Sequence, residues 1–136
     1  MNLSWVNTTR RETPSLPYEE IKIAAVGAKP EVSLAFVGDV RAKALNVEHR
    51  GKSYVPNTLS FPFDNDGSGE IFINLNQAER QAHKYGMSYE DFVAFLFIHS
   101  LLHLDGLDHG SIMERKERQL LRRFIKSNVQ NRRLRN

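Results

Sequence analysis

The chain of 136 residues contains no cysteine, which limits both its covalent stabilisation and its metal chemistry. Disulfide bonds and thiolate metal sites are excluded, so any zinc ion must be held by His, Asp or Glu. A chain without cysteine also fits a reducing cytoplasm. The length suits one compact domain, and an apolar content of 40% is enough for a single core.

Long apolar runs are missing as well. No stretch is long and apolar enough to span a bilayer. The first residues, Met1 to Asn7, lack the basic and then apolar layout of a secretion signal, and they are predicted to form a strand. We therefore expect a cytoplasmic protein that does not associate with membranes.

Internal repeats and low-complexity segments are also absent, so the chain is interpreted as a series of ordinary helices and strands. Hydrophobic spacing predicts strands at residues 1–7, 32–37, 54–63 and 70–74, and helices at residues 16–27, 40–46, 75–85, 88–103 and 113–127. The strand at 70–74 is expected to form a hairpin with Leu59–Phe61. The helix that follows Ser88 is apolar on all faces, which predicts that it is buried, with Phe92, Phe95 and Phe97 in the core.

Positive charge is concentrated at the C-terminal end. Residues 1–113 contain ten Lys/Arg and fourteen Asp/Glu, a balance of −4, whereas residues 114–136 contain nine and two, a balance of +7. Attraction to nucleic acid is expected to be strongest in this segment, although a solvated helix face explains the charge equally well. Residues from about 128 to 136 are predicted to be a flexible basic tail. The basic residues of the segment are Arg115, Lys116, Arg118, Arg122, Arg123, Lys126, Arg132, Arg133 and Arg135.

Three histidines give the strongest chemical signal. His99, His103 and His109 are spaced H-x3-H-x2-G-x2-H. Two histidines four residues apart lie on one face of a helix, and Gly106 can end that helix and turn the chain back toward the same point. Three neutral imidazoles leave the fourth position of a tetrahedral zinc ion open, which is typical of a catalytic site. The motif therefore predicts a zinc-dependent hydrolase.

Two carboxylates lie inside the motif. Asp105 or Asp108 can accept the second ring N–H of a histidine ligand and fix its tautomer. The alternative is that they are solvated turn residues, which we favour for Asp105, whereas both interpretations stay open for Asp108.

The same spacing occurs in the metzincin proteases, H-E-x-x-H-x-x-G-x-x-H, in which the Glu after the first His is the general base. Ser100 occupies that position here, and a serine does not take a proton from zinc-bound water at neutral pH. This difference argues against a metallopeptidase.

The motif HSLLHLDGLDH at residues 99–109 resembles the H-G-x-L-H-L-x-G-[YF]-D-H signature of the YbeY family, bacterial endoribonucleases of rRNA maturation. Three further segments agree in order: LNVEHR at 45–50 with L-N-x-x-[YF]-R, NTLSFP at 57–62 with D-V-L-S-F-P, and GEIFI at 69–73 with G-D-I-x-I. Met113 also falls where the family has a methionine. The resemblance covers about residues 30 to 125.

The resemblance implies an α/β (α+β) fold: a small mixed sheet of about four strands packed with helices, with one Zn²⁺ in a cleft beside the sheet. It implies a single-strand-specific endoribonuclease that acts on rRNA, at the 3′ end of the small-subunit rRNA, and in ribosome quality control. The small ribosomal subunit or its assembly factors are the expected partners, and DNA is not. The implied catalytic residues are Arg50, His99, His103 and His109, with Arg50 holding the scissile phosphate.

Three departures from the family pattern bear on activity. Ser100 replaces the usual Gly after the first His, Asn57 replaces an Asp so that a carboxylate is missing, and Leu107 replaces an aromatic residue. No general base and no aromatic platform for RNA bases are evident. A ribosome-associated binding factor with a mainly structural zinc is therefore kept as an alternative.

Overall fold

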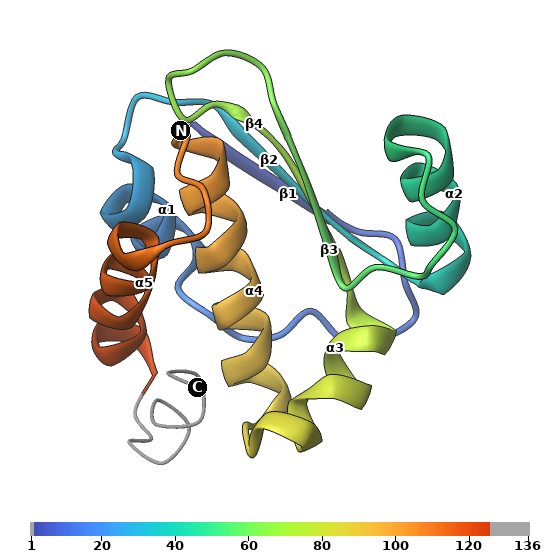
Figure 1. Ribbon diagram of the computed structural model, residues 1–136. Helices are drawn as coiled ribbons and strands as arrows, with labels where there is room; N and C mark the ends of the chain where they lie inside the picture. Colours follow the sequence, from blue (N-terminus) through green and yellow to red (C-terminus); the bar gives the residue numbers. More distant parts are fainter. Residues whose placement is uncertain (1, 126–136) are drawn as a thin grey trace.

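The computed structural model describes residues 2–125, which form a four-stranded sheet and the helices packed around it (Figure 1). The elements are β1 (Leu3–Asn7), α1 (Tyr18–Val26), β2 (Val32–Val37), α2 (Asp39–Arg50), β3 (Thr58–Pro62), β4 (Gly69–Asn74), α3 (Leu75–Ala82), the short 3-10 helix η1 (His83–Tyr85), α4 (Tyr89–Leu104) and α5 (Ser111–Phe124).

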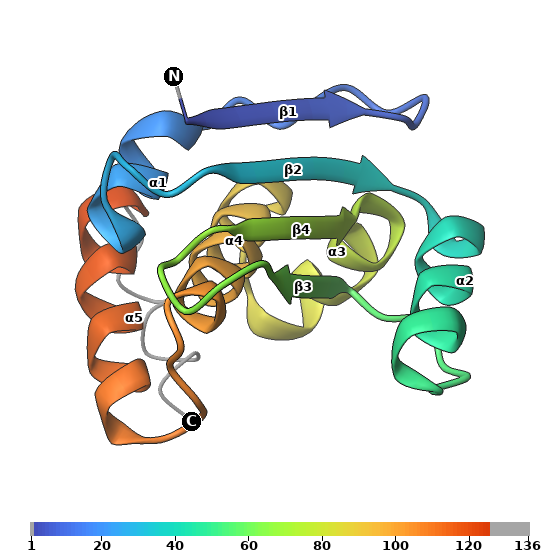
Figure 2. The same ribbon diagram turned by 90° about the horizontal axis from the view of Figure 1, so that it is seen from above.

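The sheet is mixed, with strand order β1-β2-β4-β3 (Figure 2). β1, β2 and β4 run parallel, and β3 pairs antiparallel with β4, with Leu59 opposite Phe72. The predicted pairing of residues 59–61 with the following strand is confirmed. Because β3 and β1 are the two edges of the sheet, one side of β3 is left free to border a cleft.

Helices α1, α3, α4 and α5 lie on one side of the sheet, and α2 lies on the other side, near β3 and β4 (Figure 1). α4 is the central helix of the core, as its apolar sequence predicted. Phe92 and Phe97 are buried, whereas Phe95 is only partly buried and packs against the core from its margin. This helix provides a rigid support for the residues near its C-terminal end.

Two predicted boundaries, the end of α2 and the start of β3, are wrong. The helix predicted at 40–46 runs from Asp39 to Arg50, because Gly51 ends it in the left-handed conformation at φ +65°. The strand predicted at 54–63 begins only at Thr58, because side chains of other elements hold the backbone of residues 54–56. With these boundaries, Arg50 at the end of α2 and residues of the loop before β3 line a cleft beside β3.

The C-terminal helix begins at Ser111, two residues earlier than predicted. The predicted flexible tail at about 128–136 lies outside the described residues, as do Lys126, Arg132, Arg133 and Arg135. Within residues 2–125, the structure contains no helix with the length and apolar character needed to cross a membrane.

Candidate metal centre

His99 and His103 lie one turn apart near the C-terminal end of α4. Ser88 starts this helix, and its side chain accepts a hydrogen bond from the backbone N–H of Asp91, as an N-cap does. The imidazole centroids of His99 and His103 are 4.7 Å apart. Because α4 is packed in the core, these two side chains start from a backbone that has little freedom to move.

The turn after α4 brings the third histidine back to the first two. Gly106 has φ +86°, its N–H donates to the carbonyl of His103 at 3.0 Å, and the N–H of Leu107 donates to the carbonyl of Leu102 at 3.1 Å. This pair of bonds is a Schellman motif, which reverses the chain at the end of a helix. The ring of His109 then lies 5.3 Å from that of His99 and 5.0 Å from that of His103, centroid to centroid. The predicted convergence of the three histidines is confirmed.

The ligand atoms of the three rings lie within 4.8 Å of one another. Nε2 of His99 is 3.1 Å from Nε2 of His103. A tetrahedral zinc ion with Zn–N distances of about 2.0–2.1 Å places two ligand nitrogens about 3.3–3.4 Å apart. The spacing of these rings therefore fits a shared zinc ion.

Hydrogen bonds to Nδ1 of His99 and His103 determine which ring nitrogen is available to bind a metal. Nδ1 of His103 lies 3.0 Å from the carbonyl oxygen of Leu107, and Nδ1 of His99 lies 2.7 Å from Oε2 of Glu117. A carbonyl and a carboxylate only accept, so in a neutral ring Nδ1 carries the hydrogen and Nε2 presents a lone pair. Two lone pairs at 3.1 Å repel each other unless a cation or a proton lies between them, and a metal ion removes this conflict.

The pKa of His103 is lowered from its ordinary value. Burial is the largest cause, and the neighbouring rings of His99 and His109 add to it. A lowered pKa keeps this imidazole neutral at physiological pH, which is the form that binds a metal.

Neither of the two aspartates in the histidine motif is a polar partner of the histidines. Asp105 and Asp108 are both exposed, and the structure gives neither of them a hydrogen bond to the three rings. The exposed position of Asp105 agrees with its interpretation as a solvated turn residue. The carboxylate that contacts a histidine is Glu117, on α5, which the sequence reasoning missed. The available signal was an acidic residue on the apolar face of that helix, between Met113 and Leu121.

The three histidines line one side of a cleft of about 530 Å³, here called the histidine wall. The rest of the lining, here called the β3 wall, comes from the end of α2, the loop that follows it and strand β3. Its residues are Arg50, Tyr54, Asn57, Thr58, Leu59, Ser60 and Pro62. The structure therefore brings all four predicted site residues, Arg50 and the three histidines, into one cleft. Arg50 is the last residue of α2, directly before Gly51.

The loop of the β3 wall is held in place by three other elements. Side-chain amides of Asn46, Gln77 and Asn74 donate to the consecutive backbone carbonyls of residues 54, 55 and 56, at 3.0, 2.9 and 3.1 Å. The carbonyls are thereby satisfied without a strand partner. Tyr54, which is 54% exposed, lines the cleft from this loop. Tyr54 is the aromatic residue among the described residues that line this cleft.

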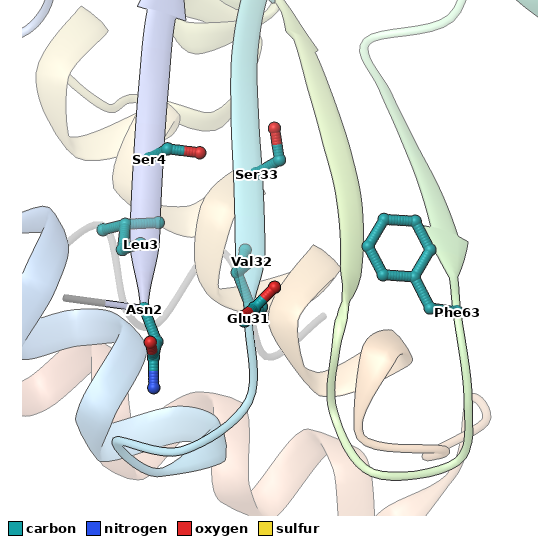
Figure 3. Close-up of a pocket in the computed structure, with 7 residues that line it drawn as sticks. All are labelled: Asn2, Leu3, Ser4, Glu31, Val32, Ser33 and Phe63. Carbon is teal, nitrogen blue, oxygen red and sulfur yellow. The ribbon is translucent and has the colours of Figure 1, made fainter.

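A second hollow, of about 270 Å³, lies at the beginning of β1 and β2 (Figure 3). Ser4 and Ser33 are register partners on the two neighbouring strands. Among the described residues, Glu31 is the only ionisable one that lines this hollow. The hollow shares no residue with the histidine cleft. The residues that line this hollow therefore lack the cluster of donors that a metal site needs.

Comparison with known proteins agrees with this geometry. A protein-family model described as Endoribonuclease YbeY matches residues 7–128. The chain belongs to the YbeY family. Two proteins named Endoribonuclease YbeY illustrate the relationship. That of Campylobacter jejuni strain RM1221 is 37% identical over 109 residues, 75% of this chain and 81% of the relative. That of Mycoplasma mycoides subsp. mycoides SC is 36% identical over 96 residues, 63% of this chain, and the match spans only 58% of the relative's length.

The solution structure of TM1509 from Thermotoga maritima has a similar fold. It superposes with a TM-score of 0.59 at 28% identity, over 76% of this chain and 73% of that one. The mixed α/β fold of this chain, with its four-stranded sheet, is thus similar overall to a solved structure.

The departures from the YbeY pattern have structural explanations. Ser100 is buried, and its hydroxyl lies 2.7 Å from that of Thr58, so its side chain joins α4 to β3. Asn57 donates through Nδ2 to Oε1 of Gln81 at 2.8 Å, and no carboxylate is among the described residues that line the cleft. Leu107 contributes its backbone carbonyl to His103, a contact that does not depend on an aromatic side chain.

Proposed function

We propose that this protein is a zinc-dependent endoribonuclease that hydrolyses phosphodiester bonds in single-stranded RNA in the cytoplasm. The observation that carries the proposal is the convergence of three imidazoles, with ligand atoms within 4.8 Å, in a cleft that also contains Arg50. Membership in the YbeY family supports RNA as the substrate.

The residues of the two walls have complementary tasks in this proposal. His99, His103 and His109 hold the zinc ion and leave one coordination position for a reactant. A zinc ion held by these side chains would supply Lewis-acid chemistry, either toward a phosphate oxygen or toward a water molecule. The guanidinium of Arg50 binds phosphate oxygens as a planar bidentate donor and stabilises the charge that develops on them during cleavage. Tyr54 offers an exposed ring on which an unpaired base can stack.

The absence of a carboxylate from the described lining limits the rate. Neither Asp nor Glu is available there to move a proton, because Asn57 stands on the β3 wall and Glu117 is turned toward Nδ1 of His99. General acid–base catalysis typically contributes about 10²–10⁴-fold. We therefore expect turnover to be slow.

The substrate is proposed to be ribosomal RNA, with the 3′ end of the small-subunit rRNA as the processed site and ribosome quality control as a second role. This proposal rests on the resemblance of the cleft residues to the YbeY pattern. Exposed cations on α5, among them Arg115, Lys116, Arg122 and Arg123, provide a surface for the RNA backbone. The small ribosomal subunit or its assembly factors are the proposed partners.

The proposal is tested by cleavage assays on purified protein, with and without chelator. Single-stranded rRNA fragments, duplex RNA and a peptide mixture serve as substrates. We expect cleavage of single-stranded RNA only, lost with chelator and restored by Zn²⁺. Arg50→Ala should retain the metal and lose most of the cleavage. RNA cleavage that is unaffected by metal removal contradicts the proposal.

A ribosome-associated binding factor is the second candidate. The missing carboxylate in the described lining favours it, since a zinc ion held by the histidines then stabilises the turn after α4 without catalysis. Binding to small ribosomal subunits with no cleavage of any RNA supports this candidate. A metallopeptidase is disfavoured, because the hydroxyl of Ser100 is buried against Thr58 and does not face the cleft as a general base.

A further inference from the structure

Glu117 is an unusual residue for the face of α5 on which it lies. This face packs on the core through Met113 and Leu121, which are buried, and through Leu120 and Phe124, which are partly buried. Glu117 lies four residues after Met113, and its side chain is only 14% exposed. The other acidic residue of the helix, Glu114, is exposed. A carboxylate on the packed side of a helix loses hydration, which is costly unless a partner replaces the lost water.

The partner of Glu117 is a proposed metal ligand. Its Oε2 lies 2.7 Å from Nδ1 of His99, whose side chain is 22% exposed. The two residues come from different helices, eighteen positions apart in the chain. The contact is on the ring nitrogen that faces away from His103, so it does not compete with metal binding at Nε2.

The contact has two consequences for a bound cation. A carboxylate accepts the Nδ1–H, so the lone pair of Nε2 is directed to the metal and the ring cannot rotate freely. A negative charge beyond the ring also increases the basicity of the imidazole and partly balances the charge of a divalent ion. His103 is oriented in the same way by a neutral carbonyl, that of Leu107. The structure gives no such partner to His109 within residues 2–125.

We propose that Glu117 is a positioning residue of the metal centre, which orients His99 and raises the affinity of the three-histidine site for a divalent cation. The inference rests on the metal site of the proposed function. Removal of such an outer carboxylate typically weakens metal binding by about 10–100-fold.

The test compares Glu117→Ala, Glu117→Gln and Glu114→Ala in the full chain. Glu114→Ala is the matched control, since it removes the same charge from the same helix at an exposed position. Zn²⁺ affinity is measured by competition with a chelating dye, and the visible spectrum of the Co²⁺-loaded protein reports ligand geometry. Unfolding of the metal-free proteins by denaturant measures any purely structural role.

For Glu117→Ala we expect Zn²⁺ affinity to fall by about 10–100-fold and the Co²⁺ spectrum to change. Glu117→Gln should recover part of the loss, because an amide oxygen still accepts from Nδ1–H. Glu114→Ala should match the wild type. Unchanged Zn²⁺ affinity in Glu117→Ala overturns the inference, as does a loss that Glu114→Ala reproduces.

Failure of the inference is distinguishable from failure of the proposed function. A wild-type protein that cleaves RNA, with a Glu117→Ala variant of equal Zn²⁺ affinity, overturns only the role of Glu117. A wild-type protein that binds Zn²⁺ and cleaves no RNA, with a Glu117→Ala variant of weakened affinity, overturns the nuclease and supports the role of Glu117. A wild-type protein that binds neither Zn²⁺ nor Co²⁺ overturns both.

Discussion

The two walls of the cleft are built in different ways. The histidine wall comes from eleven consecutive residues, a helix end and the turn after it, whose spacing alone brings the rings together. The β3 wall combines the end of α2, a loop and an edge strand, and its loop is held by amides from α2, α3 and β4. The comparison indicates that the convergence of the three histidines depends on local structure, whereas the assembly of the β3 wall depends on tertiary structure.

Of the variants that test this difference between the two walls, His103→Ala should have the largest effect. This change removes a ligand from the histidine wall and leaves the β3 wall intact. We expect Zn²⁺ affinity to fall by more than the roughly 100-fold that an outer partner costs, together with loss of RNA cleavage. Elemental analysis and the cleavage assay measure both effects. Binding of RNA to the metal-free protein should be retained, and cleavage at the wild-type rate would contradict the role of the histidines.

Arg50→Ala is the corresponding change in the β3 wall. Its metal content should match the wild type, because Arg50 does not belong to the histidine cluster. We expect kcat/KM for single-stranded RNA to fall by about 100-fold, comparable to loss of one donor to a developing negative charge. Arg50→Lys should recover only part of this, since lysine keeps the charge but not the bidentate fork. Loss of zinc in Arg50→Ala would show that the walls are not independent.

The helix of each wall ends at a glycine in the left-handed conformation, which provides a matched pair. Gly106 ends α4 at φ +86° and Gly51 ends α2 at φ +65°, and a Cβ added at either meets no atom within 4 Å. Alanine should therefore cost conformational strain alone, about 1–2 kcal/mol of unfolding free energy at both sites.

The two alanine variants should differ in function. Gly106→Ala disturbs the turn that returns His109, so Zn²⁺ affinity should fall by up to about 5–30-fold, the equivalent of that strain. Gly51→Ala should keep Zn²⁺ affinity and weaken RNA binding through Arg50. Metal titration and RNA binding on the same samples separate the two. Equal losses of metal affinity would mean that the turn after α4 has no special part in the site.

The smallest expected effect comes from the contact that joins the walls. Ser100 on α4 and Thr58 on β3 share a partly buried hydrogen bond of 2.7 Å. Ser100→Ala should lower the free energy of unfolding by about 1 kcal/mol and leave metal affinity and cleavage unchanged. Thr58→Val should cost a similar amount, and the double variant should cost less than their sum, because both remove the same bond. A large loss of cleavage in Ser100→Ala would indicate a catalytic role for the hydroxyl.

Most elements could be predicted from the sequence, and the two wrong boundaries have different causes. β2 lies at the predicted residues, and Ser88 and Gly106 bound α4 as expected, because hydrophobic period, N-cap and C-terminal glycine are local signals. The end of α2 was misjudged because the glycine that ends the helix, Gly51, lies beyond the predicted end at residue 46, and the start of β3 was misjudged because distant side chains set it. The carbonyls of residues 54–56 are satisfied by amides from other elements, which no local pattern reveals.

The residues of the candidate site can also be separated into those that local sequence determines and those that tertiary structure brings in. The order of residues by itself determined the trio His99, His103 and His109, because helical spacing and a positive-φ glycine are properties of a short segment. Only the tertiary structure decided that Arg50, Tyr54 and Glu117 join them, since each arrives from a different element packed around α4 and β3. The spacing of the three histidines is a short-range property of the backbone, whereas the lining of the β3 wall and the orientation of His99 depend on how helices and strands pack.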